Sequence, residues 1–286
     1  MKIAELLEEI TEKFAAAGIE SAKVDAELLL AFVLKTSRGE LLTKSITGSE
    51  IGEGELQEIS PLIARRVARE PLQHLTGTAF FRQLELNVGP GVFVPRFETE
   101  TVVQKAIDFL REMNLNAPVA VDLATGSGAI ALSIATELPN TRVFAIELSK
   151  EALHYTRQNF AKYSPNSVLV QGDLFEAFSE LDGTVDLVIS NPPYIPNEMI
   201  PVYPEVHLHD PQLALYGGDD GLDIVRRVEQ VARRLLREGG KLVIEHADMQ
   251  AEAVRELFAQ NFWSDVITFQ DLAGRDRMVS ATRERS

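Results

Sequence analysis

The sequence has no cysteine, and this absence excludes several kinds of chemistry. Without thiols the chain forms no disulfide, no zinc–cysteine site and no iron–sulfur cluster, and it uses no cysteine nucleophile. Basic residues are also few, since 28 Lys and Arg stand against 43 Asp and Glu, which gives a net charge of −15. Because Lys and Arg supply most of the affinity of proteins for long nucleic acids, we expect no stable nucleic-acid binding.

Long apolar runs are missing as well. No stretch approaches the roughly 20 apolar residues needed to span a bilayer. Residues 1–14, MKIAELLEEITEKF, have the pattern of an acidic amphipathic helix, which differs from that of a secretory signal peptide. We therefore expect a cytoplasmic protein without a membrane partner, and a monomer. With 286 residues, 45% apolar and 25% charged, the chain has ordinary globular composition and room for about two domains.

Helical periodicity dominates residues 1–71. Apolar residues recur at three- and four-residue spacing over Ile3–Phe14, and this pattern predicts a first helix. A second helix is expected after Ser21 and a third over residues 54–70, ended by Pro71. No catalytic group is evident in this helical bundle. We interpret it as a partner-docking domain, with a purely stabilising appendage as the alternative.

The pattern then changes. Residues 72–98 alternate apolar and polar positions around several glycines, which predicts a hairpin or linker. Strand-length and helix-length segments alternate over residues 99–286, which predicts an α/β fold with a doubly wound, mostly parallel sheet. The expected strands are residues 117–124, 141–148, 167–174, 184–190, 241–247, 265–271 and 277–283. The last two are too close for a helical crossover and are expected to pair antiparallel. A helix is expected over Leu222–Glu238, ended by Gly239 and Gly240.

A glycine loop, VDLATGSGAIAL (residues 121–132), stands between a predicted strand and the start of a helix. Backbone N–H groups in such a loop face polar atoms of a ligand, and the missing Cβ atoms permit close approach. Glu147 ends the next strand, where its carboxylate is positioned to accept both hydroxyl protons of a ribose. Together these features predict a nucleoside-containing cofactor. Because Gly126 to Ala131 also fits the G-x-G-x-x-A dinucleotide fingerprint, a nicotinamide-dependent dehydrogenase stays open at this point.

The segment SNPPYIP, residues 190–196, follows the strand predicted over residues 184–190, at the edge where such sheets bind ligands. Asn191 would present a side-chain carbonyl there, and Pro192 a backbone carbonyl. Two acceptors at this spacing suit the two protons of a planar NH₂ group, either a carboxamide or an exocyclic base amine. Tyr194 offers a flat face beside that group. A dehydrogenase does not explain this motif, whereas a methyltransferase that acts on an NH₂ group does.

The glycine loop, Glu147 and NPPY together resemble the S-adenosylmethionine-dependent methyltransferases that modify amino groups. Three further segments narrow the resemblance to the HemK/PrmC family: GTAFFRQLELNVGPGVFVPRFETE (77–100), DPQLALYGGDDGLD (210–223) and DLAGRDRMV (271–279). Members of that family methylate the side-chain amide nitrogen, N5, of the glutamine in the Gly-Gly-Gln loop of class I peptide chain release factors. The likeness covers nearly the whole chain. It implies that a Rossmann-like class I methyltransferase domain follows the helical domain in the sequence. It also implies S-adenosyl-L-methionine as cofactor, S-adenosyl-L-homocysteine as product, and class I release factors as partners.

The resemblance also implies which residues form the site. The cofactor would contact Ala124, Thr125, Gly126, Ser127, Gly128, Glu147, Asp173, Leu174 and Asn191. The substrate amide would contact Asn191, Pro192, Pro193 and Tyr194, among which Asn191, Pro192 and Tyr194 carry the catalytic role. No metal is expected, since His207 and His209 lack further ligands at suitable spacing. The alternative function is methylation of an exocyclic amine of a nucleic-acid base.

Three positions depart from the family's pattern. Ala124 stands where glycine is usual, Phe97 replaces the second proline of Pro-Arg-Pro-Glu-Thr-Glu, and His209-Asp210-Pro211 replaces a Glu-Pro pair. Alanine tolerates fewer backbone conformations than glycine, so the first departure bears on the cofactor contact at residue 124.

Overall fold

The computed structural model describes residues 1–259 and 262–284. The chain divides into two compact units. The first, the helical unit, comprises Met1–Thr78 and Val202–His209, and the second, the sheet unit, comprises Ala79–Pro201 and Asp210–Ser286. Residues 202–209 belong to the helical unit in this division, although they lie in the sequence between two parts of the sheet unit.

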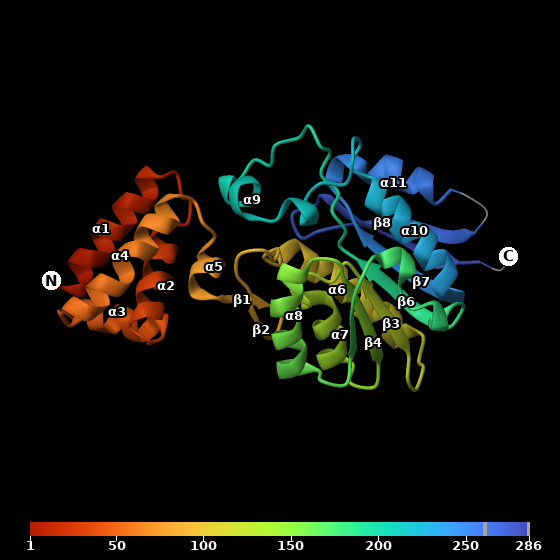
Figure 1. The fold of residues 1–286 in the computed structure, drawn as a ribbon, viewed down its shortest axis with the longest axis horizontal. Coiled ribbons are helices and arrows are strands. Elements are labelled where there is room, and N and C mark those ends of the chain that lie inside the picture. The colour runs from red at the N-terminus through yellow and green to blue at the C-terminus, as the bar shows by residue number, and fades with distance from the viewer. Residues whose placement is uncertain (260–261, 285–286) are drawn as a thin grey trace. The chain divides into compact units, whose positions relative to one another are not determined.

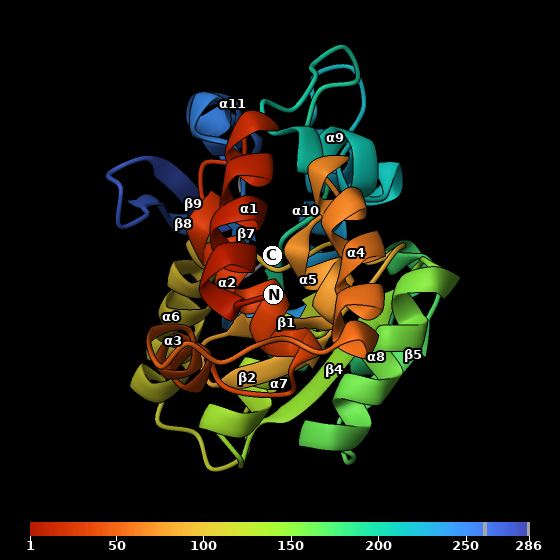
Figure 2. The same cartoon turned by 90° about the vertical axis from the view of Figure 1, so that its left-hand side faces the viewer.

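The helical unit is mainly α-helical (Figure 2). They are α1 (Ile3–Ala16), α2 (Ala22–Val33), α3 (Arg38–Ile46), α4 (Glu53–Val67), α5 (Leu72–Thr76) and α9 (Pro204–His209). The helices α1, α2 and α4 pack against one another around fully buried side chains such as Ile10, Leu29 and Ile59. Each of these three helices turns one mainly apolar face inward, because its buried residues recur at helical spacing.

The apolar pattern predicts neither α3 nor α5, because α3 has a single buried residue, Leu41, and α5 spans only five residues. A capping box marks the start of α3. Ser37 Oγ accepts from the Glu40 N–H at 3.2 Å, and the Glu40 carboxylate accepts from the Ser37 N–H at 2.9 Å. This Ser-x-x-Glu spacing is visible in the sequence and is the signal that identifies the helix. Helix α4 ends at Val67, before the predicted residue 70, and Arg69 adopts a left-handed φ of +69° just beyond it.

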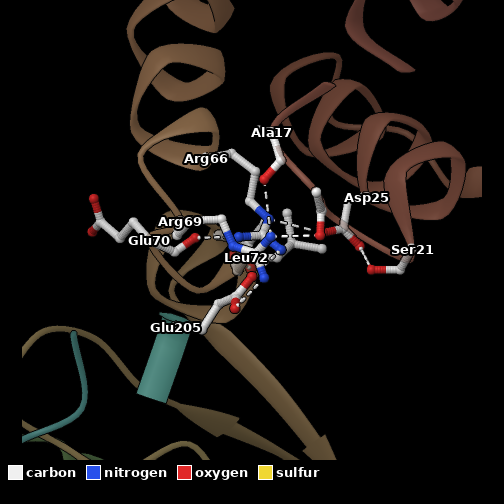
Figure 3. A network of polar contacts seen from close by, with 10 residues as sticks. Ala17, Ser21, Asp25, Arg66, Arg69, Glu70, Leu72 and Glu205 are labelled. Atoms are coloured by element: carbon white, nitrogen blue, oxygen red, sulfur yellow. Dashed lines mark hydrogen bonds and ion pairs between the residues drawn. The ribbon is translucent and has the colours of Figure 1, made fainter. Parts of the chain in front are cut away.

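A buried ion-pair network explains why α9 belongs to the helical unit (Figure 3). Glu205 of α9 accepts from Arg66 Nη2 at 2.9 Å and from Arg69 Nη2 at 2.6 Å. Arg66, whose side chain is 5% exposed, also donates from Nε to Asp25 Oδ2 at 2.8 Å. Burial disfavours the charged form of Glu205, but the two arginines outweigh it and hold its pKa below the ordinary value. Helical periodicity gives no sign of this contact, because the partners lie 139 and 136 residues apart.

The described residues of the sheet unit form a seven-stranded sheet with the order β5-β4-β3-β6-β7-β9-β8. Its strands are β3 (Val119–Leu123), β4 (Arg142–Glu147), β5 (Val168–Gln171), β6 (Val185–Ser190), β7 (Leu236–Glu245), β8 (Trp263–Gln270) and β9 (Asp276–Arg283). The five strands from β5 to β7 in this order are parallel, and β9 pairs antiparallel with β7 and β8. The predicted mostly parallel sheet with an antiparallel end pair is therefore confirmed.

Helices cover both faces of this sheet (Figure 1). On one face lie α6 (Phe97–Glu112), α7 (Ala129–Glu137) and α8 (Lys150–Tyr163), together with the hairpin of β1 (Thr78–Phe81) and β2 (Leu84–Asn87). On the other lie α10 (Asp223–Leu235) and α11 (Ala251–Leu257). Short 3-10 turns are η1 (Leu174–Glu176), η2 (Ser179–Leu181), η3 (Gln212–Ala214) and η4 (Asp248–Gln250). No helix in the described ranges combines the length and apolarity that crossing a membrane requires.

The end of α10 differs from the prediction. The helix stops at Leu235, and Gly239 and Gly240 lie inside β7 instead of ending a helix. The pairing of β7 with β6 shifts register here, between Val185 and Leu187 of β6. A Cβ on Gly240 would lie 3.0 Å from the Val185 carbonyl oxygen. The glycine therefore permits close backbone approach at an irregularity of the sheet, a role that depends on a neighbouring strand.

Candidate active site

The strand order of the sheet reverses beside β3. From β3 the chain proceeds outward through β4 to β5, and β6 and β7 then continue on the other side of β3. Sheets of this kind bind ligands at such a reversal, beyond the carboxyl ends of the strands. Leu123 pairs with Ile146 and with Ser190, and Ser190 pairs with Ile244. The residues that follow these four therefore reach the same edge, namely Ala124, Glu147, Asn191 and Glu245.

The glycine loop after β3 has a left-handed backbone at three positions. The φ angle is +63° at Ala124, +57° at Gly126 and +87° at Gly128. A Cβ on Gly128 would lie 2.9 Å from the Phe160 ring, so this glycine allows α7 and α8 to pack closely. A Cβ on Gly126 would meet no atom within 4 Å, so the space in front of this glycine is open. Ala124 holds a conformation that costs an L-residue about 1 kcal/mol and that glycine adopts freely.

Asp122 supports the loop from inside the sheet. Its Oδ2 accepts from the Thr125 hydroxyl at 2.5 Å and from the Ala131 N–H at 3.1 Å. Its Oδ1 is buried and has no partner among the described residues. Burial raises the pKa of Asp122 to about 7, although the two hydrogen bonds act in the opposite direction. Thr125 thus uses its side chain to brace the loop, and Ser127 is buried with its carbonyl bound by Asn159 Nδ2 at 2.9 Å.

Glu147 is the last residue of β4 and is 8% exposed. Its Oε2 accepts from the Gly126 N–H and its Oε1 from the Ser149 N–H, both at 2.8 Å. Burial raises the pKa of Glu147, and these N–H donors oppose the rise. Each carboxylate oxygen keeps a second acceptor position, so the pair fits two adjacent hydroxyl groups of a ribose. Together with the open space at Gly126, this set of acceptors fits a nucleoside cofactor.

Asp173 and Leu174 follow β5, which lies next to β4. The Gly172 N–H donates to the Glu147 carbonyl at 3.0 Å and ties this loop to the end of β4. The Asp173 carboxylate accepts a backbone N–H of η1 at 3.0 Å and lies 3.6 Å from Arg227 Nη1. Leu174 packs against the apolar core on the α10 face of the sheet. Both residues thus lie at the same edge as Glu147.

The segment SNPPYIP presents two hydrogen-bond acceptors. Asn191 donates from Nδ2 to Thr99 Oγ1 at 3.2 Å, and Thr99 donates to Glu245 Oε2 at 2.7 Å. Tyr194 donates its hydroxyl proton to Glu245 Oε1 at 3.3 Å. Within the described part of the chain, no donor lies against Asn191 Oδ1 or the Pro192 carbonyl oxygen. These oxygens are the predicted acceptor pair, and both keep free lone pairs.

Residues 210–223 pack against NPPY through two glycines. A Cβ on Gly217 would lie 2.6 Å from the Pro193 carbonyl oxygen, and one on Gly221 would lie 2.2 Å from the Tyr194 carbonyl oxygen. Only glycine permits backbones to approach so closely. Burial and the neighbouring carboxylate raise the pKa of Tyr194, so its hydroxyl stays protonated and remains a donor.

Neither Thr99 nor Glu245 is among the residues predicted from the sequence. Glu245 ends a buried strand as Glu147 does, so the reasoning that selects Glu147 selects Glu245 when it is applied to β7. Thr99 gives no such signal, because it is an ordinary polar residue in the first turn of α6 and its burial depends on the fold. Burial raises the pKa of Glu245 to about 7, against the Thr99 hydrogen bond and the charge of Arg277.

The structure shows the environment of two positions that depart from the family's pattern, Asp210 and Phe97. Asp210 is buried, and its Oδ2 lies 2.6 Å from Arg96 Nη2. The Arg96 guanidinium also lies over the Phe93 ring, 4.8 Å from its centroid. Phe97 begins α6 and is 77% exposed, so replacing a proline here places an apolar ring at the surface of the unit.

Two family models match the chain. The PrmC N-terminal domain model matches residues 5–77, and the methyltransferase small domain model matches residues 84–200. A release factor glutamine methyltransferase of Streptomyces coelicolor is 50% identical over 275 residues, which are 96% of this chain and 95% of that protein. A 4-amino-L-phenylalanine/4-methylamino-L-phenylalanine methyltransferase of Streptomyces pristinaespiralis is 39% identical and covers 92% of this chain and 89% of that protein. A solved methyltransferase structure from Pyrococcus furiosus, 22% identical, covers 71% of this chain and 90% of that chain with a TM-score of 0.50, which supports the fold alone.

Proposed function

Because the chain belongs to the release factor glutamine methyltransferase family, we propose that it methylates N5 of the glutamine in the Gly-Gly-Gln loop of class I peptide chain release factors. The enzyme is an S-adenosylmethionine-dependent methyltransferase. The observation that carries the substrate proposal is the acceptor pair at the sheet edge, Asn191 Oδ1 and the Pro192 carbonyl oxygen. A primary amide offers two N–H donors in one plane, and such a pair can accept both.

The acceptor pair addresses the main chemical difficulty of the reaction. An amide nitrogen is a weak nucleophile, because its lone pair is delocalised into the carbonyl group. Accepting both protons orients the nitrogen and favours electron density on it. S-adenosylmethionine, when bound, supplies a methyl group activated by its sulfonium. Holding the reacting groups in line contributes about 7 kcal/mol or more in good cases.

The amide proton is expected to leave to water after methyl transfer. Glu245 is the carboxylate linked to Asn191, but its two oxygens already accept from Thr99 and Tyr194. It therefore lacks the direct contact that a general base needs.

We assign the cofactor to the glycine loop, residues 124–128, with Glu147 on the ribose hydroxyls. The open space at Gly126 and the free acceptor positions of Glu147 support this assignment. Asp173 and Leu174, one strand further along the edge, would flank the adenine. Asn191 lies at the reversal of strand order and would face both cofactor and substrate.

We propose that the helical unit docks the release factor. Val24, Leu28 and Phe32 are 38–44% exposed and follow one another at four-residue spacing on α2, so they form one apolar row. An exposed apolar row is typical of a protein-binding surface. The match of residues 5–77 to the PrmC N-terminal domain supports the same role. The cytoplasmic location and the monomeric state stay predictions of the sequence.

A second candidate is methylation of a small aromatic amine. The Streptomyces pristinaespiralis relative is named for 4-amino-L-phenylalanine, whose aryl amine is also an NH₂ group with two donor protons. The amine of a nucleic-acid base has the same chemistry, but the net charge of −15 disfavours that substrate.

Transfer of labelled methyl groups from S-adenosylmethionine to an unmethylated release factor tests the proposal. We expect label in the factor, and none in a factor whose loop glutamine is replaced by alanine. Label in 4-amino-L-phenylalanine and none in the factor would contradict the proposal. As a control on mechanism, Asn191→Ala is expected to lose methyl transfer by about 100-fold, the cost of removing one transition-state hydrogen-bonding group. Cofactor affinity should fall much less, because Asn191 is one of several residues assigned to the cofactor. Equal loss of both would refute the role of Asn191.

A further inference from the structure

The orientation of the Asn191 amide decides whether the site can work. A side-chain amide has an acceptor on one branch and donors on the other, in nearly identical shapes. With its oxygen toward the substrate, Asn191 accepts a proton of the substrate NH₂ group. Flipped by half a turn, it would present its own NH₂ group and repel the substrate. The proposed function therefore needs something that fixes this amide.

Glu245 supplies a one-way chain of hydrogen bonds. An ionised carboxylate only accepts, so the single proton of the Thr99 hydroxyl goes to Glu245 Oε2, 2.7 Å away. Thr99 Oγ1 is then left with lone pairs alone, and it accepts from Asn191 Nδ2 at 3.2 Å. The amide nitrogen of Asn191 is thereby directed to Thr99, and Oδ1 to the opposite side.

The same carboxylate also holds the second residue of the motif. Its other oxygen, Oε1, accepts from the Tyr194 hydroxyl at 3.3 Å. Glu245 is 2% exposed, so water does not compete for either bond. One buried carboxylate at the end of β7 thus contacts Thr99 of α6 and Tyr194 of the NPPY segment.

We propose that Glu245 is a positioning residue for methyl transfer, which acts through Thr99 to keep the Asn191 oxygen directed at the substrate NH₂ group. The inference rests on the proposed function, because it assumes that Asn191 accepts from the substrate. It assigns to Glu245 no contact with substrate or cofactor. Its role is to set the direction of a hydrogen-bond chain.

The charge state of Glu245 makes this role sensitive to pH. Burial raises the pKa of Glu245 to about 7, while the Thr99 hydrogen bond and then the charge of Arg277 on β9 lower it. Tyr194 lowers it further by hydrogen bonding, and Glu98 on α6 raises it. Once protonated, Glu245 can itself donate to Thr99, whose own proton then turns toward Asn191 and favours the flipped amide. The working orientation is therefore held above pH about 7 and is lost as the pH falls through that value.

Glu245→Gln tests the inference with almost no change of shape. The new amide can donate to Thr99, so we expect kcat for release factor methylation to fall by about tenfold or more at pH 8. Cofactor affinity and KM should stay within a few-fold of the wild-type values. The decline of wild-type kcat below pH about 7 should be absent from the variant.

Thr99 provides a matched pair of controls that leave the carboxylate intact. Thr99→Val removes the hydroxyl at constant shape and should reproduce the loss of kcat, whereas Thr99→Ser keeps the hydroxyl and should retain activity. Wild-type kcat in Glu245→Gln, or an unchanged acid limb in that variant, would overturn the inference and leave the proposed function standing. Equal activity of the valine and serine variants would also overturn it, even if Glu245→Gln fails to fold. A wild-type enzyme that does not methylate the factor would overturn both proposals together.

Discussion

The partners of buried carboxylates differ between the helical unit and the carboxyl ends of β3, β4 and β7 in the sheet unit. In the helical unit the carboxylates are paired with arginines. Asp25 lies 2.8 Å from Arg66, and the partly buried Glu205 is held by Arg66 together with Arg69. Glu27, another buried acid of this unit, lies 2.6 Å from an arginine of α3. Each of these acids joins two helices of the unit.

At the carboxyl edge of the sheet the buried acids have neutral partners. Asp122, Glu147 and Glu245 accept from hydroxyl groups and backbone N–H groups. Within the described residues, none of the three has a Lys or Arg side chain within 4.0 Å. Burial raises the pKa of all three.

The difference separates acids that hold the fold from acids that serve the site. An arginine partner offsets part of the desolvation free energy of a buried carboxylate, whereas neutral donors offset less of it. Unpaired buried acids therefore cost stability, and they persist where they orient or bind something. In this chain they are found in β3, just before the glycine loop, and at the ends of β4 and β7, all toward the carboxyl edge of the sheet.

Removing an arginine from the paired set should have the largest effect on stability. Arg66→Ala leaves Asp25 buried without its partner and takes one of two arginines from Glu205. Breaking a buried ion pair costs about 3–5 kcal/mol, and we expect a loss of about 3 kcal/mol in urea unfolding. Lys13→Ala, which breaks an exposed pair with Glu9, is the control and should cost less than about 0.5 kcal/mol. Similar losses in both variants would show that the buried ion pairs stabilise the fold no more than an exposed pair does.

Neutralising a buried acid that has no ion-pair partner should raise the stability of the protein instead of lowering it. The pKa of Asp122 is about 7 in the fold and near 4 in the unfolded chain, so the stability it contributes is complete below pH about 4 and is lost as the pH rises through 7. Asparagine does not ionise. Asp122→Asn should therefore gain about 1 kcal/mol or more over the wild type at pH 8, since one pKa unit corresponds to about 1.4 kcal/mol.

Thermal unfolding of this variant at pH 4, 6 and 8 measures the effect. The gain should grow between pH 4 and 7 and then stay level. Asp186→Asn is the matched control, because Asp186 is also buried and lies in the adjacent strand. Asp186 lies 2.5 Å from Arg237, so its neutralisation should lower stability. A gain for Asp122→Asn that does not vary with pH would exclude ionisation as its cause.

The smallest expected effect concerns the backbone of the same loop. Ala124 has a φ of +63°, which glycine adopts at no cost. Ala124→Gly should raise stability by about 0.5 kcal/mol. The free energy gained by relieving the backbone strain exceeds the entropic cost of ordering the more flexible glycine on folding. Urea unfolding checks the sign, and Ala129→Gly within the helix that follows should lower stability. A loss in Ala124→Gly would show that the loop is not strained there.

Much of the candidate site follows from the sequence because its parts lie at the ends of predictable strands. The glycine loop, Glu147 and SNPPYIP each follow a buried apolar run, and parallel strands bring such positions to one edge. The parallel sheet and its antiparallel end pair follow from the spacing of apolar segments in the same way.

What the sequence alone does not determine depends on partners far along the chain. Gly239 and Gly240 resemble a helix stop until β6 is placed beside them. Residues 202–209 join the helical unit because Glu205 meets two arginines more than 130 residues away. The chain from Glu245 through Thr99 to Asn191 spans 146 and 92 residues. Local pattern thus determines the elements and the motifs of this protein, whereas only tertiary packing decides which buried polar groups meet, because hydrogen bonds and ion pairs depend on distances that periodicity does not encode.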